Sequence, residues 1–349
     1  MTSASSVNVI DLTTDELRAR FQKDKIEPYR AQQVHQWVFE KGVYEFDKMT
    51  NLPVELRARI KEKYSVDLPE IVDRERSSGD KSTKLLLKLK KGDFVEAVLM
   101  PLETRTTVCI SSQVGCKFHC AFCASGQNGF MRNLTSGEIL GQVLRARDLA
   151  PDKKITNLVY MGIGEPFDNY DNLLKSIRQL NAKGSMGIGA RRITVSTCGV
   201  VPKIERFSDE GMQIELSVSL HGPNDTVRGS IMPVNQAFPV KELMAVCKKY
   251  AKKTKRAITF EYILIKGVNS SITIANQLGR LLEGMLCKVN LIPYNPIEEF
   301  PHEAPNYQDI VKFQQTLQNY GIRTTVRFSK GQDIQAACGQ LRSVHLKKK

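Results

Sequence analysis

The chain has 349 residues, of which 41% are hydrophobic and 25% are charged, a composition typical of a folded protein with a sizeable core. No apolar run reaches the roughly eighteen residues of a membrane-spanning helix, and no basic start followed by an apolar core marks a secretion signal, so we expect a cytoplasmic protein without a membrane partner. The net charge of +14 favours a polyanionic partner such as nucleic acid, although basic clusters also occur as plain solvated surface.

Residues 1–83 are predicted to form a small N-terminal helical domain. Apolar spacing and capping signals place its helices at Thr14–Lys23, Arg30–Lys41 and Val54–Lys63. Residues 84–104 contain two strand-like runs around Lys91-Gly92-Asp93, which indicates a β-hairpin. We interpret this hairpin as a linker to the next domain.

From residue 105 to residue 341, strand-like and helix-like segments alternate. Such alternation predicts a parallel sheet with covering helices, and six units before a last strand near Thr324–Phe328 predict a partial (β/α)6 barrel of the α/β class. Residues 342–349 form a basic tail. The six expected strands are Thr106–Ser111, Ile155–Met161, Arg192–Ser196, Gln213–Leu220, Ile258–Ile265 and Lys288–Pro293.

Three of the eight cysteines, Cys116, Cys120 and Cys123, are spaced as C-x3-C-x2-C just after the first of these strands. Thiolates this close together suit a soft metal centre. A [4Fe–4S] cluster held by three thiolates keeps one iron open to a substrate, whereas structural zinc needs a fourth ligand. His119 could supply that ligand, but it stands between two cysteines, where we expect its side chain to point away. The spacing therefore favours the iron–sulfur cluster.

Six motifs along the chain resemble the RlmN/Cfr family of radical S-adenosyl-L-methionine (SAM) methyltransferases, which modify adenosine carbons in RNA. The resemblance implies a partial barrel that carries a [4Fe–4S] cluster and SAM, with a helical N-terminal domain that helps to grip RNA. The motifs are CISSQVGC at 109–116, GFMRNL at 129–134, MGIGEP at 161–166, SLH at 219–221, LIPYNP at 291–296 and AACGQL at 336–341.

The same resemblance implies roles for individual residues. Cys338 becomes methylated, Cys109 later forms a transient disulfide with it, and Glu96 accepts a proton from the substrate. The implied SAM contacts fall at or just beyond the carboxyl ends of expected strands, where parallel barrels build their active sites. Each of them alone would be an ordinary loop residue. These contacts are Gly164, Glu165, Ser196, Ser219, Leu220, His221 and Asn295.

The chemistry explains why a radical is needed. Carbons C2 and C8 of adenine are electron-poor and do not attack a methyl sulfonium. The implied reaction therefore uses two SAM molecules: one methylates the Cys338 thiolate, and the other yields a 5′-deoxyadenosyl radical that removes hydrogen from that methyl group. The resulting carbon radical adds to adenine, Glu96 removes the ring proton, and Cys109 attacks the Cys338 sulfur to release the RNA.

Gly164-Glu165-Pro166 favours C2 over C8, because within the family the C2 enzymes carry Gly-Glu-Pro. The expected substrate is an adenosine of the peptidyl-transferase centre in 23S rRNA, with tRNA as a second candidate and flavodoxin or ferredoxin as electron donor. Three alternatives stay open: a Cfr-like C8 methyltransferase that gives antibiotic resistance, another radical SAM enzyme such as a glycyl-radical activase, and a non-catalytic zinc-stabilised RNA-binding protein. We assign Cys198, Cys247 and Cys287 to packing.

Overall fold

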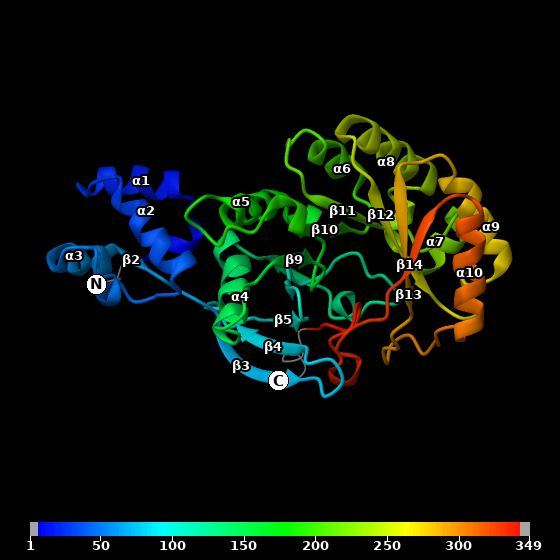
Figure 1. Ribbon diagram of the computed structural model, residues 1–349, viewed down its shortest axis with the longest axis horizontal. Helices are drawn as coiled ribbons and strands as arrows, with labels where there is room; N and C mark the ends of the chain where they lie inside the picture. The colour runs from blue at the N-terminus through cyan, green and yellow to red at the C-terminus, as the bar shows by residue number, and fades with distance from the viewer. Residues whose placement is uncertain (1–5, 343–349) are drawn as a thin grey trace.

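A computed structural model of the chain describes residues 6–342; apart from Arg342, the expected basic tail lies outside the described residues. Figure 1 shows a helical unit at one end of the molecule and a long twisted sheet with its helices over the rest. Within residues 6–342, none of the helices has the length and apolar character needed to cross a membrane.

The N-terminal unit forms where the sequence predicts helices. The first helix begins at a capping box, in which the Thr13 hydroxyl accepts from the Glu16 N–H at 3.2 Å and the Glu16 carboxylate accepts from the Thr13 N–H at 2.7 Å. The second expected helix is confirmed, although its last turn is a π-turn. The elements are β1 (Val7–Asn8), η1 (Val9–Asp11), α1 (Thr14–Lys23), α2 (Arg30–His35), η2 (Gln36–Glu40), η3 (Phe46–Lys48), α3 (Val54–Lys63) and β2 (Tyr64–Ser65).

A single ten-stranded sheet forms the rest of the framework, in the order β14-β13-β12-β11-β10-β9-β6-β5-β4-β3. The strands from β6 to β14 are parallel, and the sheet stays open because β14 and β3 are its edges, as expected for a partial barrel. The expected parallel strands are confirmed to within about two residues at each end. The bounds are β6 (Thr106–Cys109), β9 (Asn157–Tyr160), β10 (Ile193–Thr197), β11 (Glu215–Ser219), β12 (Ile258–Leu264), β13 (Cys287–Pro293) and β14 (Arg323–Val326).

The expected hairpin is present as β4 (Thr83–Lys88) and β5 (Phe94–Pro101), but it continues the sheet instead of standing apart from it. β5 pairs antiparallel with β6, and β4 pairs with a further strand, β3 (Glu70–Arg76), which we did not expect. β3 escapes prediction because its sequence, EIVDRER, has no apolar face. It is the exposed edge strand, where charged side chains discourage pairing with other chains.

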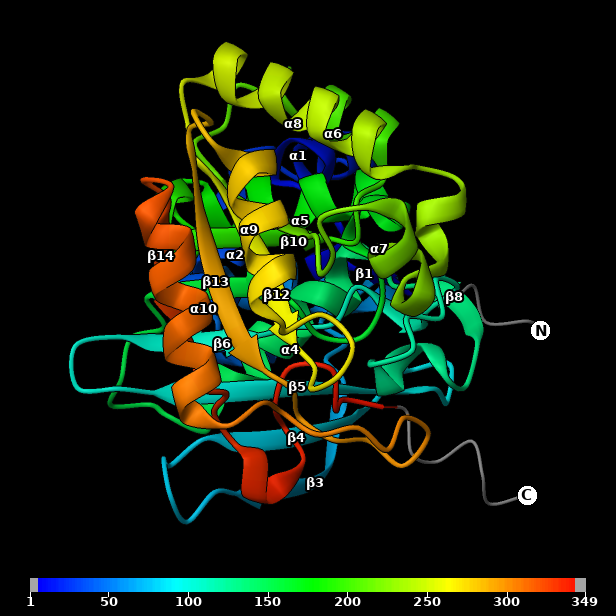
Figure 2. The same ribbon diagram turned by 90° about the vertical axis from the view of Figure 1, so that its right-hand side faces the viewer.

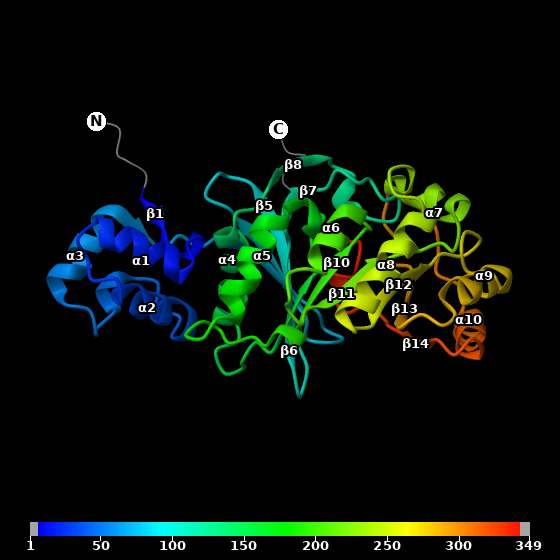
Figure 3. The same ribbon diagram turned by 90° about the horizontal axis from the view of Figure 1, so that it is seen from above.

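Helices cover the outer side of the parallel strands, as Figure 2 and Figure 3 show for α8, α9 and α10. A capping box begins α4, because the Thr135 hydroxyl and the Glu138 carboxylate each accept the other residue's N–H. These helices are α4 (Ser136–Asp148), α5 (Tyr170–Asn181), α6 (Val201–Phe207), α7 (Asp225–Ile231), α8 (Val240–Thr254), α9 (Ile272–Leu282) and α10 (Tyr307–Asn319). Short elements between them are β7 (Gln113–Gly115), η4 (Ala124–Gly126), β8 (Phe130–Asn133), η5 (Pro166–Asn169), η6 (Ala190–Arg192), η7 (Pro233–Gln236) and η8 (Gln332–Ile334).

The helical N-terminal unit is bonded to the barrel through the first turn of α4 and through α5. The Asp11 carboxylate accepts from the Gly137 N–H at 2.7 Å, and the Gln179 side-chain amide donates to the Leu12 carbonyl at 2.7 Å. Asp11 therefore sits at a helix N-terminus, which favours an anion.

After β14 the chain crosses back to the antiparallel strands, seen as the red segment of Figure 1. Among the contacts that attach it to the antiparallel side, Lys84 Nζ donates to the Ile334 carbonyl at 2.7 Å, the Gly331 N–H donates to Asp80 at 2.8 Å, and the Arg342 N–H donates to the Glu96 carboxylate at 2.7 Å. This return segment, residues 327–342, brings Cys338 to the carboxyl ends of the parallel strands.

Candidate active site

Two adjoining cavities open at the carboxyl ends of the strands. The larger one has a volume of about 160 Å³ and is lined by residues from the cysteine loop and from several strand ends. The smaller one, of about 20 Å³, lies between β5, β6, β9 and the return segment. Met161, Arg327 and Cys338 line both cavities, so the wall between the two is built around these three side chains.

Cys116, Cys120 and Cys123 all line the larger cavity, on the loop that joins β7 to η4. Backbone bonds fix this loop: the Cys116 N–H donates to the Gly129 carbonyl at 3.0 Å, and the Cys123 N–H donates to the Cys120 carbonyl at 3.0 Å. His119 is exposed and does not line the cavity, in agreement with the expectation that it points away.

The three cysteines fit an iron–sulfur cluster by their chemistry and by their shared wall. Burial raises the pKa of the Cys116 thiol to about 12, so a positive centre must accompany its sulfur for the thiolate to form. Within residues 6–342, no three His, Cys, Asp or Glu side chains converge closely enough for one mononuclear ion. The agreement with an iron–sulfur cluster therefore rests on three cysteine sulfurs that line the same cavity.

Gly164 and Glu165 enter the same cavity just after β9. Gly164 has φ +99°, and a Cβ there would lie 2.5 Å from the Gln113 side chain, so only glycine fits. The buried Glu165 carboxylate accepts from the Phe167 N–H at 3.0 Å and from the Cys198 N–H at 2.7 Å. Burial raises the pKa of Glu165, and these donors oppose that shift. The carboxylate is thus fixed at the cavity wall.

Ser196, Ser219 and His221 line the larger cavity as well, from the ends of β10 and β11. His221 adopts φ +57°, and its Nδ1 accepts from the Ile263 N–H at 3.0 Å. Burial lowers the pKa of His221 to about 3, so the ring is neutral and carries its proton on Nε2. His221 can therefore donate one hydrogen bond from that atom.

Two of the expected SAM contacts, Leu220 and Asn295, do not line the larger cavity. The Leu220 side chain is fully buried in the main core. Asn295 lines neither cavity: its amide nitrogen donates to the Ser329 hydroxyl at 2.9 Å and to the Cys338 carbonyl at 3.2 Å. In this structure Asn295 therefore anchors the return segment next to Cys338.

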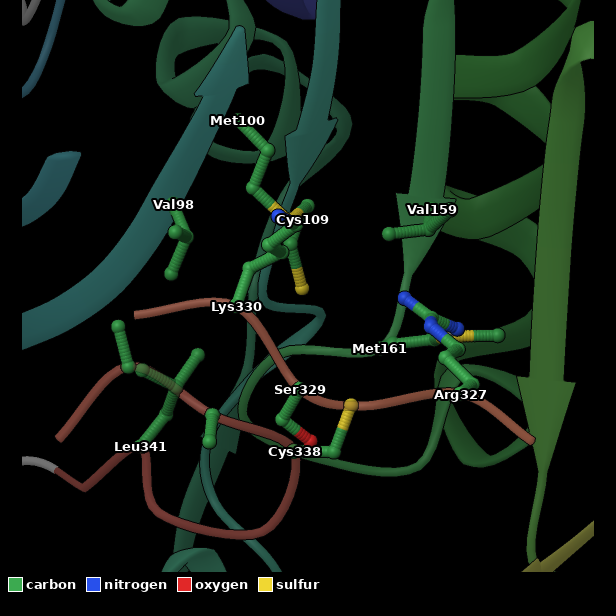
Figure 4. Close-up of a pocket in the computed structure, with 12 residues that line it drawn as sticks. Val98, Met100, Cys109, Val159, Met161, Arg327, Ser329, Lys330, Cys338 and Leu341 are labelled. Atoms are coloured by element: carbon green, nitrogen blue, oxygen red, sulfur yellow. The ribbon is translucent and has the colours of Figure 1, made fainter. Parts of the chain in front are cut away.

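Cys109 and Cys338 face the smaller cavity together. Figure 4 shows their sulfur atoms pointing toward one another, Cys109 from β6 and Cys338 from the return segment. Both thiols are free in the structure. Cys109 is buried and lines only the smaller cavity, whereas Cys338 is half-buried and also lines the larger one.

Glu96 lies on β5, on the same face as Val98 and Met100, which line the smaller cavity. Its carboxylate is buried and accepts from the Arg342 N–H, so it is covered by the return segment. Burial raises the pKa of Glu96 to about 7, which suits a group that gains and loses a proton near neutrality.

Three residues of the cavity walls escaped the sequence reasoning. Cys198, which we assigned to packing, lines the larger cavity, and its N–H contributes to the fixing of Glu165. Glu261 stands in the middle of β12, and one of its carboxylate oxygens is buried with no hydrogen-bond partner among residues 6–342. Arg327 directly follows β14. A lone carboxylate inside the apolar run ITFEYIL was the available signal for Glu261, while Arg327 had none.

Two family models match separate segments of the chain. Residues 7–66 match the model of the "Ribosomal RNA large subunit methyltransferase N-terminal domain". Residues 110–273 match the model of the "Radical SAM superfamily", which contains the cysteine loop and most of the cavity wall.

Three similar proteins cover nearly the whole chain. A probable dual-specificity RNA methyltransferase RlmN of Clostridium novyi is 43% identical over 97% of this chain and 99% of its own length. The protein of the same name from a Thermoanaerobacter species is 45% identical over 98% of this chain and 99% of its own length. The crystal structure of a radical SAM methyltransferase from Sphaerobacter thermophilus superimposes with a TM-score of 0.94 at 44% identity, covering 97% of this chain and 99% of that one.

Proposed function

This chain belongs to the RlmN family of radical SAM RNA methyltransferases, and we propose that it methylates carbon 2 of an adenosine in the peptidyl-transferase centre of 23S rRNA. It is a SAM-dependent transferase with a radical SAM fold. Because the chain resembles enzymes of this family over nearly its full length, the alternative of a non-catalytic zinc-stabilised RNA-binding protein has no support.

One observation carries the proposal: Cys338 borders both the cavity of the three cysteines and the cavity that contains Cys109. In the proposed sequence, Cys116, Cys120 and Cys123 hold a [4Fe–4S] cluster, which when bound supplies the electron that cleaves SAM. Cys338 carries the methyl group between the cofactor and the base. Cys109 faces the Cys338 sulfur, where it can form the disulfide that releases the product.

The larger cavity offers groups that complement SAM. Glu165 presents a fixed carboxylate to an ammonium group, and His221 offers a donor at Nε2. Gly164, Ser196 and Ser219 share its wall. Of the remaining contacts proposed from the resemblance, Leu220 contributes only backbone at this position, and Asn295 reaches SAM only if the return segment moves.

Glu96 is the proposed base that removes the proton from the adenine ring. A pKa of about 7 leaves a substantial fraction of carboxylate at neutral pH. The return segment covers this carboxylate through Arg342, so we infer that the segment shifts when RNA enters.

Two features favour C2 and more than one RNA. Gly164-Glu165-Pro166 is the form of the motif found in the C2 enzymes of the family, and Pro166 begins η5 directly after Glu165. The relatives are named dual-specificity RNA methyltransferases, which supports tRNA as a second substrate. The remaining parts of the proposal are a cytoplasmic location and a flavodoxin or ferredoxin as electron donor.

Mass spectrometry of RNA tests the position directly. Purified enzyme is incubated anaerobically with SAM, a reductant and unmodified 23S rRNA or tRNA, with the Cys338→Ala variant as matched control. We expect 2-methyladenosine from the natural chain and none from the variant. Formation of 8-methyladenosine instead would identify a C8 enzyme, and 2-methyladenosine made by the variant would refute the role of Cys338.

A further inference from the structure

Arg228 is a fully buried cation that stands behind the wall of the larger cavity. It lies on α7 with an exposed fraction of 0%, and it lines neither cavity. Its Nη1 donates to Asn235 Oδ1 at 2.9 Å and to the Phe238 carbonyl at 3.2 Å. Its Nη2 donates to the Cys198 carbonyl at 2.6 Å. These three acceptors are neutral oxygens, so the buried charge serves to hold backbone and amide groups in place.

One of these acceptors belongs to the residue that fixes Glu165. The carbonyl of Cys198 accepts from Arg228, and the N–H of Cys198 donates to the Glu165 carboxylate at 2.7 Å. The two groups share one residue, so a shift of the carbonyl moves the N–H as well. Glu165 lines the larger cavity, whereas Arg228 does not. Arg228 therefore acts on this cavity through the main chain of Cys198.

The turn after β10 leaves room for the guanidinium. Gly199 has φ +105°, and a Cβ there would lie 3.0 Å from Arg228 Nη2 and 3.1 Å from the Leu243 side chain. The Thr197 hydroxyl accepts from the Gly199 N–H at 3.1 Å, which closes the turn. A larger residue at position 199 would push the guanidinium away from the Cys198 carbonyl. The local sequence thus favours the close approach of Arg228.

The helix that carries Arg228 also contacts the cysteine loop. The Ile231 carbonyl, at the end of α7, accepts from the Ala121 N–H at 2.9 Å. Ala121 stands between Cys120 and Cys123 in the sequence. One short helix is therefore bonded to two parts of the cavity wall: the cysteine loop directly, and Glu165 through Arg228 and Cys198. It keeps the carboxylate in a fixed place relative to the thiols.

We propose that Arg228 is a positioning residue that directs the Glu165 carboxylate toward the amino group of SAM, acting through the main chain of Cys198. The inference rests on the proposed function, which assigns SAM to the larger cavity. A guanidinium suits this role because it presents several donors in one rigid plane and stays charged when it is buried. Without it, the oxygens around it lose their donor, and the turn that holds Glu165 relaxes.

The proposal predicts an effect on one kind of ligand only. S-adenosylhomocysteine has the amino group of SAM but no methyl group to transfer, so it binds without reacting. 5′-Methylthioadenosine keeps the adenosine and the sulfur but lacks the amino acid part, and offers nothing to Glu165. A charge-assisted hydrogen bond depends on distance and direction, so a misplaced carboxylate weakens only the first ligand. A general loosening of the barrel weakens both.

Binding of these two compounds to the cluster-loaded enzyme tests the proposal. Anaerobic isothermal titration calorimetry gives both Kd values, and their ratio is the readout. We expect Arg228→Met to weaken S-adenosylhomocysteine about tenfold and 5′-methylthioadenosine by less than about twofold. Glu165→Gln should show the same selective loss. Arg228→Lys, which keeps a charged donor for the Cys198 carbonyl, should restore most of the affinity.

Two further variants control for folding. Arg147→Met is the matched control, because Arg147 also donates to two backbone carbonyls, but at the junction with the N-terminal unit. It should leave both Kd values unchanged. Asn235→Ala removes one acceptor of Arg228 and leaves the guanidinium in place, so a smaller selective loss is expected. Iron content and thermal unfolding of each variant show whether the site is intact.

The contrary results are distinct. A natural ratio of Kd values in Arg228→Met with full iron content, or an equal loss for both compounds, would overturn the role of Arg228. If Arg228→Met does not hold its cluster, Asn235→Ala decides, and a natural ratio there is the negative result. A natural ratio in Glu165→Gln would show that Glu165 does not meet the amino group, and the proposal would fail with that contact.

The outcomes also separate this proposal from the proposed function. If the natural chain fails to methylate RNA while Arg228→Met still loses S-adenosylhomocysteine selectively, the function is wrong and the role of Arg228 stands. If the natural chain methylates RNA and Arg228→Met keeps the natural ratio, only the role of Arg228 is wrong.

Discussion

Glu96 illustrates how burial prepares a single side chain for chemistry. An acid whose pKa is raised to about 7 is mostly neutral below that pH and mostly ionised above it. If the carboxylate removes the ring proton, RNA methylation should rise about tenfold per pH unit below pH 7 and level off above it. Glu96→Gln, which can still accept from the Arg342 N–H, should lower the rate at pH 8 at least a hundredfold, within the roughly 10²–10⁴ typical of a lost general base.

Rate measurements between pH 5.5 and 8.5 check this prediction. Methylation of Cys338 by SAM is the internal control, because it removes no proton from adenine and should be intact in Glu96→Gln. A variant that keeps the full RNA methylation rate and the same pH profile would show that another group accepts the proton.

The cysteines allow a matched comparison within one cavity. Cys116→Ala removes one of three proposed cluster ligands, and Cys198→Ala removes another thiol of the same wall that lies outside the motif. We expect Cys116→Ala to lose bound iron and RNA methylation, whereas Cys198→Ala keeps its iron, because the backbone N–H that holds Glu165 remains. Iron and sulfide analysis after anaerobic reconstitution measures the bound iron of both variants. Loss of iron from Cys198→Ala alone would contradict the three-cysteine assignment.

At the scale of elements, the return segment depends on a few polar contacts. Asn295, just beyond β13, bonds both the Ser329 hydroxyl and the Cys338 carbonyl. Asn295→Ala removes these two bonds and the bond that its side-chain oxygen accepts from Gln332. Each is worth about 1 kcal/mol, so local opening of residues 336–340 should become about tenfold easier or more. Hydrogen exchange measured by mass spectrometry reports this opening, with α4 as an internal reference that should not change. Unchanged exchange combined with weaker SAM binding would instead make Asn295 a SAM contact only.

The regular elements could be predicted from the sequence because their signals are local. Thr13 and Thr135 each form the capping box that their sequences indicate, and the apolar run of β12 is buried on both faces. β3 and the irregular return segment could not be predicted. β3 owes its place to pairing with β4, and residues 327–342 owe theirs to partners some 250 positions away, such as Asp80 and Lys84.

The residues of the site also divide into those with a local sequence signal and those without one. The three proposed cluster cysteines are recognisable in the sequence because a soft metal centre requires thiolates at short spacing, and Glu165 is recognisable from the motif in which it stands. Arg327 carries no such signal in the sequence. It is recognised as part of the site only from the cavity wall that it shares with Cys338 and Cys109.

At the scale of the whole molecule, the net charge of +14 has a measurable consequence. Binding to RNA phosphates releases counterions, so the apparent affinity falls as a power of the salt concentration. The kcat/KM for RNA methylation should therefore fall steeply, by tenfold or more, between 50 and 200 mM KCl, if several phosphates are contacted. In the proposed function SAM methylates Cys338 at the cavity wall, where the reacting groups are shielded from salt, so the rate of this step should change less than twofold.

The same enzyme preparation thus provides both measurements, and their ratio isolates the contribution of RNA binding. A parallel fall of the two rates would mean that salt acts on the barrel or on the cofactor. A salt-independent kcat/KM would mean that shape and base contacts, and not the positive surface, recruit the RNA.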